Sequence, residues 1–465
     1  MAGIGFELKK LFKKEGVLSI LKAYGYTGMI TAGPMLLGIG LLLGIVYIGK
    51  ANGLSEHAGD LLVSMITYAL LGSLILTSVF SMINTRYLAD MIYEGKENRI
   101  LSSLLGVLAI ELPVGAAVCI VFLMFAGIGL SLMVLFFTLF MELIVSFTAM
   151  SYMTAVKSYK EILISYVFAA TGAFATAFIL SLIFKPATTL LLFSAVVGYG
   201  VMMVEDIRIL YRYFKVSRGH YFDFMSYFKK YGTLAVISFM MNIGLFSHLV
   251  IAWSGSIGRK IYGLFYAAPQ HDIAALFAFL TILMTTINFV ASVEVNFYPK
   301  YRRYYDLFNT NGSILEIEQA EKEMLTVLWH ELSYTARRQF YFTALMMSIG
   351  LAVLNTLPLG FDSLMGGYFR ILCVGYGAYA VGNVLMLILL YFTDYKGAKW
   401  AAVSFAIIST GVSLVSLSFK AKYYGFGFTV GAMVYFLICY VELRRFTSKL
   451  QYHILSTQPL VSGKE

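Results

Sequence analysis

Residues 112–141, LPVGAAVCIVFLMFAGIGLSLMVLFFTLFM, contain no Asp, Glu, Lys or Arg. An α-helix needs about 20 apolar residues to cross the hydrocarbon core of a bilayer. The wider block 100–156 carries only Glu111 and Glu142 before Lys157, and its length fits two such helices. The block therefore predicts two consecutive membrane-spanning helices.

The same pattern recurs along the whole chain. Charged residues are 13% of the 465 residues and hydrophobic ones 59%, whereas soluble domains are about 25% charged. Further uncharged runs of 19 or more residues occupy 23–49, 61–85, 162–184, 186–204, 231–258, 273–293, 339–361, 371–393, 400–419 and 423–441. With the two helices above, they predict an all-α integral membrane protein with twelve transmembrane helices.

The distribution of Lys and Arg predicts how the chain sits in the membrane. With the N-terminus in the cytoplasm, 28 of the 35 basic residues fall in cytoplasmic segments and seven fall outside. This asymmetry follows the positive-inside rule, so both termini are expected in the cytoplasm. It also accounts for most of the net charge of +10. No basic domain lies outside the membrane, and we therefore expect no nucleic-acid partner.

Segment 1–24 is basic and amphipathic. Ile4, Leu8, Leu11 and Phe12 share one face of a helix, and four lysines group on the other. The apolar run that follows exceeds the length of a signal-peptide core and lacks a convincing cleavage site. We expect an interfacial helix on the anionic inner leaflet, which serves either as a charged anchor or as a docking element.

Six expected helices precede segment 208–230 and six follow it. Equal halves predict two six-helix bundles, 25–207 and 231–444, packed around a central cavity, as in transporters built from repeated halves. Segment 208–230 is expected to be a basic cytoplasmic linker, and 445–465 a cytoplasmic tail.

Segment 299–338 of the second half has the signature of an amphipathic helix. Ser313-x-x-Glu316 is a capping box. The apolar stripe includes Ile317, Leu325 and Leu328. We expect a cytoplasmic amphipathic helix of several turns. It either tethers its two neighbouring spans along the membrane surface or forms the site where a cytoplasmic enzyme docks.

Two acids lie deep within expected spans. A charge in hydrocarbon is costly, so Glu111 and Glu142 are candidates for proton or cation coupling or for lining a polar path. The alternative is a neutral carboxyl group hydrogen-bonded to a neighbouring helix. Pro34 and Pro113 also lie within spans and predict helix kinks, which can flank a cavity.

Polar residues within the expected spans include Asn84, Asn242, His248 and Asn288. Cavity lining and hydrogen bonding between helices explain them equally well. The three Cys and six His fit no metal-ligand spacing, and neither a nucleotide-binding loop nor a catalytic motif is present. We therefore expect neither an enzyme nor a bound metal or cofactor. Energy must come from a gradient, a partner, or synthesis of the transported molecule.

Four stretches, MAGIGFELKKLF, AYGYTGMITAGP, FYPKYRRYY and IEQAEKEM, resemble the Pel exopolysaccharide transporters. That family belongs to a twelve-helix flippase superfamily, which also holds multidrug extruders and lipid-linked sugar flippases. The resemblance implies a bacterial inner-membrane protein that moves a biofilm polysaccharide from a cytoplasmic glycosyltransferase across the membrane. It also implies a cyclic di-GMP-binding membrane regulator and a repeat-containing scaffold as partners. In the superfamily, the helices that here carry Asn84, Asn242, His248 and Asn288 face the central cavity.

Three functions stay open at this point. A polysaccharide conduit is favoured, because the cytoplasmic amphipathic segments suit a protein with a cytoplasmic partner. A gradient-driven antiporter of the same fold, for small molecules or lipid-linked sugars, is the alternative. A membrane glycosyltransferase or polymerase would need a large extramembrane loop with clustered acids, and the longest expected outer loop, Ser254–Asp272, is short.

Overall fold

The computed structural model describes residue 33 and residues 36–156, 159–215, 219–309, 312–356 and 361–457. The expected helix at 1–24, Pro34 and the last eight residues lie outside this part of the chain.

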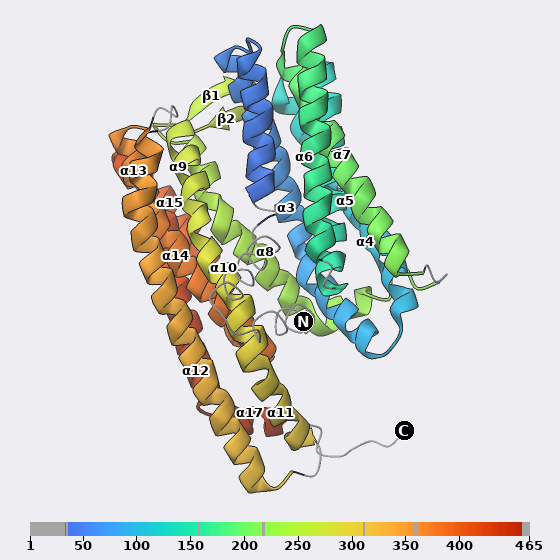
Figure 1. Cartoon of the computed structure of the whole chain (residues 1–465), viewed down its shortest axis with the longest axis vertical. Helices are drawn as coiled ribbons and strands as arrows, with labels where there is room; N and C mark the ends of the chain where they lie inside the picture. Colours follow the sequence, from blue (N-terminus) through green and yellow to red (C-terminus); the bar gives the residue numbers. More distant parts are fainter. Residues whose placement is uncertain are drawn as a thin grey trace, which may run out of the picture.

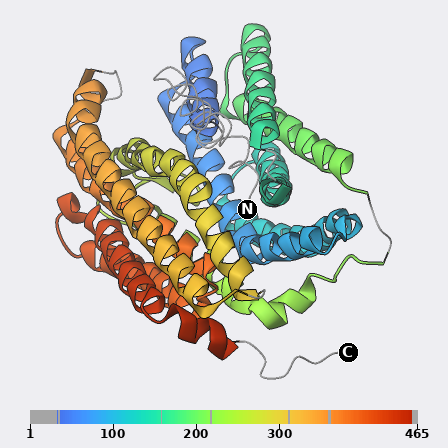
Figure 2. The ribbon, with the colours of Figure 1, turned by 60° about the horizontal axis from the view of Figure 1, so that its bottom comes forward.

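Two groups of helices stand side by side (Figures 1 and 2). The first lobe comprises the helix Leu36–Ala51, α3 (Glu56–Tyr93), η1 (Glu97–Arg99), α4 (Ile100–Ala126), α5 (Leu130–Val156), α6 (Tyr159–Ile183) and α7 (Thr188–Tyr213). The second lobe begins with α8 (Met225–Trp253), β1 (Arg259–Tyr262), β2 (Phe265–Ala267), α9 (Pro269–Phe279), η2 (Leu280–Ile282), α10 (Leu283–Phe289) and η3 (Val290–Phe297). It continues with α11 (Tyr298–Asn309), α12 (Ile314–Leu345), η4 (Met346–Gly350), α13 (Leu351–Thr356), α14 (Ser363–Tyr391), α15 (Tyr395–Ser416), η5 (Ala421–Tyr423), α16 (Phe426–Thr447) and α17 (Leu450–Thr457).

The expected order of spans is confirmed. In the described residues, eleven helical segments are long and apolar enough to cross a membrane. The helix Leu36–Ala51 is a shorter apolar helix at the place of the first expected span. The uncharged block around residues 112–141 forms α4 and α5, and Gly127 separates them in a left-handed conformation with φ +67°. Glycine adopts this conformation without steric cost.

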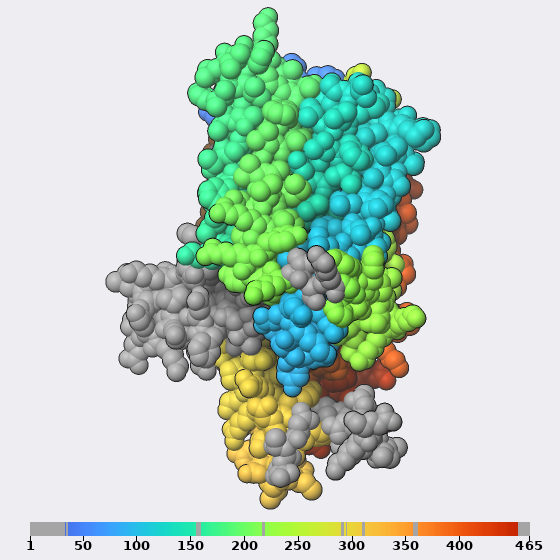
Figure 3. All heavy atoms as spheres, turned by 90° about the vertical axis from the view of Figure 1, so that its right-hand side faces the viewer, coloured from blue at the N-terminus to red at the C-terminus, as the bar shows by residue number. Residues whose placement is uncertain are grey.

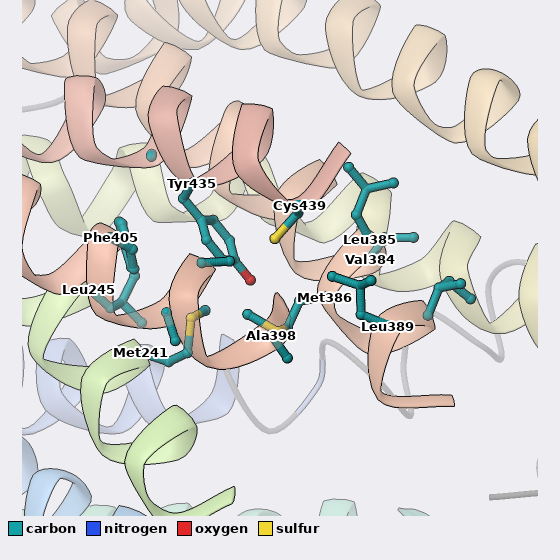
Figure 4. Packing of buried hydrophobic residues seen from close by; sticks show 14 of the residues in the cluster. Met241, Leu245, Val384, Leu385, Met386, Leu389, Ala398, Phe405, Tyr435 and Cys439 are labelled. Atoms are coloured by element: carbon teal, nitrogen blue, oxygen red, sulfur yellow. The ribbon is translucent and has the colours of Figure 1, made fainter. Parts of the chain in front are cut away.

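Each lobe has its own core, and a few residues cross between them: Ile83 of α3 packs in the core of the second lobe, and Phe265 of β2 in that of the first. In the second lobe, α14 lies at the centre and packs against α9, α12 and α16, and its side chains Tyr376, Leu385 and Leu389 are buried. Figure 4 shows part of this core, in which Tyr435 and Cys439 of α16 face side chains of α8, α14 and α15. Buried side chains fill the interior of each lobe. A transport path would therefore run between the lobes or along one of their faces.

Contacts near both ends of the first lobe join it to the second. At the linker end, where α7 leads into α8, Phe224 is fully buried in a core cluster of the first lobe. There Tyr227 also donates a hydrogen bond to Asp90 of α3 at 3.1 Å. At the opposite end, which we call the hairpin end, the antiparallel pair β1–β2 reaches from the second lobe to the first (Figure 1).

Segment 299–338 differs from the expected surface helix. It forms α11 and most of α12, and α12 continues through η4 and α13, so that 314–356 is a single helical run of 43 residues. The capping box is present, because Ser313 and Glu316 bond each other's backbone N–H groups. We call α11 and the first turns of α12 the extension. It projects beyond the linker end instead of lying across it (Figures 1 and 3). The physical reason is that its apolar stripe packs within the chain, where Leu328 is fully buried.

Candidate substrate cavity

A cavity of about 270 Å³ lies where the first lobe meets α8 of the second. Its lining residues are Leu74, Thr77, Ser78, Ser81, Asn84 and Thr85 of α3, Glu111 of α4, Phe147, Thr148, Met150, Ser151 and Thr154 of α5, and Asn242 of α8. Three polar residues that the sequence singled out, Asn84, Glu111 and Asn242, therefore meet at one place.

The lining follows helical periodicity. On α3, the positions 74, 77, 78, 81, 84 and 85 recur every three or four residues, which puts them on one face. The same spacing puts Thr148, Ser151 and Thr154 on one face of α5. These hydroxyl residues were not among the candidates that the sequence indicated. Their signal was the recurrence of Ser and Thr at helical spacing within otherwise apolar spans.

Most of these hydroxyl groups donate to their own helix. Such bonds to the carbonyl oxygen three or four residues earlier are made by Thr77, Ser78, Thr85, Ser151 and Thr154. A hydroxyl has one proton to donate and two lone pairs that accept. Since the protons are committed to the backbone, the hydroxyl oxygens present mainly acceptor capacity to the cavity.

Two further acceptors belong to buried side chains. Thr148 donates a hydrogen bond to Oε2 of Glu111. Oε1 of Glu111 and Oδ1 of Asn84 have no hydrogen-bond partner among the described residues. An unpaired buried acceptor costs about 1–3 kcal/mol. The cavity is thus chemically suited to a guest rich in O–H or N–H donors.

Asn242 is the contribution of the second lobe. Its Nδ2 donates to the Ser238 carbonyl oxygen of the same helix at 3.0 Å. The side-chain oxygen therefore supplements the acceptors from α3, α4 and α5. Because α8 carries this residue, any movement of the second lobe relative to the first changes the cavity.

The other two expected path residues lie elsewhere. Asn288 of α10 donates from Nδ2 to Thr335 at 2.8 Å and accepts from Arg338 at 3.1 Å, both on α12. Its amide therefore joins two helices. His248 of α8 is buried inside the second lobe, where it contacts His271 of α9. Neither residue lines the cavity.

Glu142 and Pro113 also lie outside the cavity lining. Glu142 of α5 packs against the backbone of α7 at Gly200, where an added Cβ would lie 3.0 Å from Oε1. Pro113 lies inside α4, two residues after Glu111, with its ring exposed on the bundle surface. Its predicted effect on helix direction stays a prediction.

The three residues expected to dock a partner differ in how far their side chains are exposed. Leu328 is buried in the core, and Ile317 and Leu325 are half-buried against it. At the first turn of α12, however, Ile314 and Leu315 are 76% and 78% exposed. Docking stays a prediction, and the apolar surface available for it lies at this tip.

The hairpin end closes the interface between the lobes. Phe265 of β2 is fully buried in the core of the first lobe, where it meets Phe122 and Phe136 edge-on. The Tyr68 hydroxyl of α3 accepts from the Tyr266 backbone N–H at 3.1 Å and donates to its carbonyl oxygen at 3.2 Å.

Charge and backbone fit strengthen this closure. Arg259 of β1 pairs with Asp60 of α3 at 2.6 Å. Gly263 at the hairpin turn has φ +56°, and an added Cβ would collide with the Ala126 carbonyl oxygen at the end of α4. Only glycine fits a turn that is both left-handed and this close to another backbone. We call this set of contacts the hairpin closure.

The chain is similar to known proteins both in sequence and in structure. The family model for PelG, an exopolysaccharide exporter (EPS-E), matches residues 1–455. Comparison with curated protein sequences found no match.

Among solved structures, an outward-facing multidrug-resistance MATE transporter of the MOP superfamily aligns with TM-score 0.61 and 13% identity over 97% of this chain and 100% of its own. A MOP superfamily transporter from Pyrococcus furiosus aligns with TM-score 0.59 and 12% identity over 91% of this chain and 96% of its own. At these identities the likeness establishes a shared fold.

Proposed function

Because the chain belongs to the PelG family of exopolysaccharide exporters, we propose that it is a conduit that passes a growing polysaccharide across a bacterial inner membrane. The acceptor-lined cavity between the lobes carries this proposal. A sugar hydroxyl that leaves water without a partner loses several kcal/mol in an apolar medium. The oxygens of α3, α5 and α8 offer such partners along the path.

The shape of the cavity suits a short piece of a chain. Its volume of about 270 Å³ is slightly below the usual range of binding pockets, which is roughly 300–1,000 Å³. Phe147 adds an aromatic ring to the polar lining, and such rings pack against the C–H faces of sugars. A polymer would then move through stepwise, with only one segment in contact with the oxygens at a time.

The orientation belongs to the same proposal. We assign the linker end to the cytoplasm and the hairpin end to the outside, since most basic residues fall in segments at the linker end. Polymer enters at the linker end, where a cytoplasmic glycosyltransferase extends it. The hairpin closure is then the barrier that must open at the exit. The cyclic di-GMP-binding regulator and the repeat-containing scaffold complete the proposed complex.

Addition of sugars at the cytoplasmic end supplies the driving force in this account. One observation favours a second candidate, a proton- or cation-coupled antiporter. Glu111 places a buried carboxyl oxygen without a described partner in the cavity itself. A coupled carrier needs a group of this kind to load and release its ion.

Closing the exit tests the conduit directly. Cysteines at positions 60 and 259, in a background without Cys119, Cys373 and Cys439, are joined by a short thiol-reactive crosslinker in vesicles that synthesise polymer. We expect export to stop while synthesis continues. When the crosslinker is a cleavable one, its cleavage should restore export. Each single-cysteine variant is the control. Full export through the crosslinked protein would refute a path that leaves through the hairpin closure.

A further inference from the structure

Two histidines face each other inside the second lobe. His248 and His271 are 1% and 0% exposed, and Nδ1 of the first lies 3.5 Å from Nε2 of the second. The Tyr376 hydroxyl lies 3.4 Å from Nε2 of His248. The cavity and the residues assigned to the transport path leave this pair unexplained.

A carboxylate connects the pair to the surface. Nδ1 of His271 has no hydrogen-bond partner among the described residues. It lies 3.9 Å from Oδ1 of Asp272, whose side chain is 29% exposed. Asp272 is in the first turn of α9 and accepts from the Ala268 backbone N–H at 2.9 Å. The order Asp272, His271, His248 therefore forms a chain of polar groups from solvent to the core.

The same carboxylate touches the hairpin closure. Nε1 of Trp253 donates to both Asp272 oxygens at 3.1 and 3.0 Å. The Trp253 ring stacks on Tyr68 with centroids 4.6 Å apart and planes 9° apart. Tyr68 holds the backbone of Tyr266, as described above. Three successive contacts, through Trp253 and Tyr68, thus connect Asp272 to the strand that closes the lobes.

We propose that the His248–His271 pair binds a proton, which enters through Asp272, and that its occupancy loosens the hairpin closure. Imidazole changes charge near neutral pH in water, and burial disfavours its charged form, so the extra proton is held on His271, next to the Asp272 carboxylate. Two imidazoles in contact accept one extra proton between them, because two positive charges at this distance repel strongly. A protonated His271 directs Nδ1–H to the Asp272 carboxylate. The carboxylate then moves away from Trp253, and the stack of Trp253 on Tyr68 weakens.

The residues around His248 and His271 include several other titratable groups. Phe428 of α16 and Leu245 of α8 add no titratable side chain. Titratable groups near the pair are Asp272 on α9, Tyr368 and Tyr376 on α14 and, next to these tyrosines, Cys373, Tyr379, Asp362 and Tyr424. Asp272 is the carboxylate closest to the histidines among these residues, which is why the proton path is assigned to it.

Trp253 is a built-in reporter for this proposal. The other two tryptophans, Trp329 and Trp400, are changed to phenylalanine, and the full-length protein is titrated between pH 5 and 8 in nanodiscs. We expect a pH-dependent transition in Trp253 emission. The transition should disappear in His248→Gln/His271→Gln and persist in His57→Gln, an exposed histidine at the same end.

The crosslinking pair at positions 60 and 259 reports the closure itself. Thiol reactivity itself rises with pH, so the yield in the parent is divided by the yield in the double histidine variant at the same pH. This ratio should fall as the pH is lowered, because proton binding loosens the closure. A Trp253 transition that survives in the double variant and is lost only in Asp272→Asn would overturn the proposal, because Asp272 alone would then titrate. If the double variant fails to fold, His248→Gln decides. An unchanged midpoint in that variant overturns the proposal, and a displaced midpoint supports it.

Discussion

Thr148 on α5 donates its hydroxyl hydrogen to one oxygen of Glu111 on α4, and the other oxygen of that carboxyl group is without a partner among the described residues. Both side chains line the same cavity. The hydrogen bond holds the acid in place from a neighbouring helix. Its second oxygen is available either to a cargo hydroxyl or to a coupling ion.

The conduit account predicts that titration of the intramembrane acids is dispensable. Glu111→Gln and Glu142→Gln, singly and together, keep the shape and an acceptor oxygen but cannot exchange a proton. We expect export to survive largely in all three variants, measured as polymer released by vesicles at equal protein abundance. If either variant stops export while synthesis continues, and a protonophore stops wild-type export too, the coupled antiporter is the correct mechanism.

Loss of cavity acceptors should slow export. The double variant Asn84→Leu/Asn242→Leu removes two amide groups from the lining. A loss of one or two hydrogen bonds of about 1 kcal/mol each corresponds to a roughly 5- to 30-fold decrease in export rate. Protein abundance should stay normal. Normal export from a protein that carries both leucines would assign these residues to packing.

Asn288→Leu is the matched comparison, with the same substitution outside the cavity. It removes hydrogen bonds to Thr335 and Arg338 between α10 and α12. We expect a loss of stability of about 1–3 kcal/mol, seen as a lower melting temperature in detergent. Export per folded molecule should be unchanged. A selective export defect at full stability would place Asn288 on the path after all.

The extension beyond the linker end offers a test of partner docking. Ile314→Glu/Leu315→Glu changes two exposed side chains at its tip. We expect the glycosyltransferase to be lost from the purified complex while the protein stays folded. Leu328→Glu, in the same helix, should instead unfold the extension, because a charge would enter the core. Full recovery of the glycosyltransferase with the tip variant would exclude this docking site.

The fold was predictable because each span is long and uncharged, a pattern that only a membrane requires. The path of segment 299–338 was not. An amphipathic stripe shows that one face of a helix is buried, but not what buries it. Leu328 is buried by other side chains of the same protein and not by lipid. The kink of α8 at Tyr231 and the π-helical turn η4 arise without proline. The π-helical turn η3 is followed by Pro299, which cannot donate a hydrogen bond to the carbonyl oxygen of residue 295.

The candidate site was predictable in part. Asn84, Glu111 and Asn242, which line the cavity, were singled out because strongly polar side chains are rare in spans. Asn288 and His248 carry the same signal, but their partners Arg338 and His271 lie on other helices. Only tertiary structure distinguishes a polar group paired with a neighbour from one that faces a cavity. The hydroxyl residues were missed because Ser and Thr are common in membrane helices.

Capture of the polymer inside the cavity tests the central claim most directly. A photo-crosslinking amino acid is placed at Ser81, which lines the cavity, or at Phe178, which is exposed on the outer surface of α6. Vesicles that synthesise labelled polymer are irradiated during export. We predict that the polymer becomes attached to the protein through position 81 and not through position 178. Normal export with no polymer attached at position 81, or equal attachment at both positions, would contradict a path through this cavity.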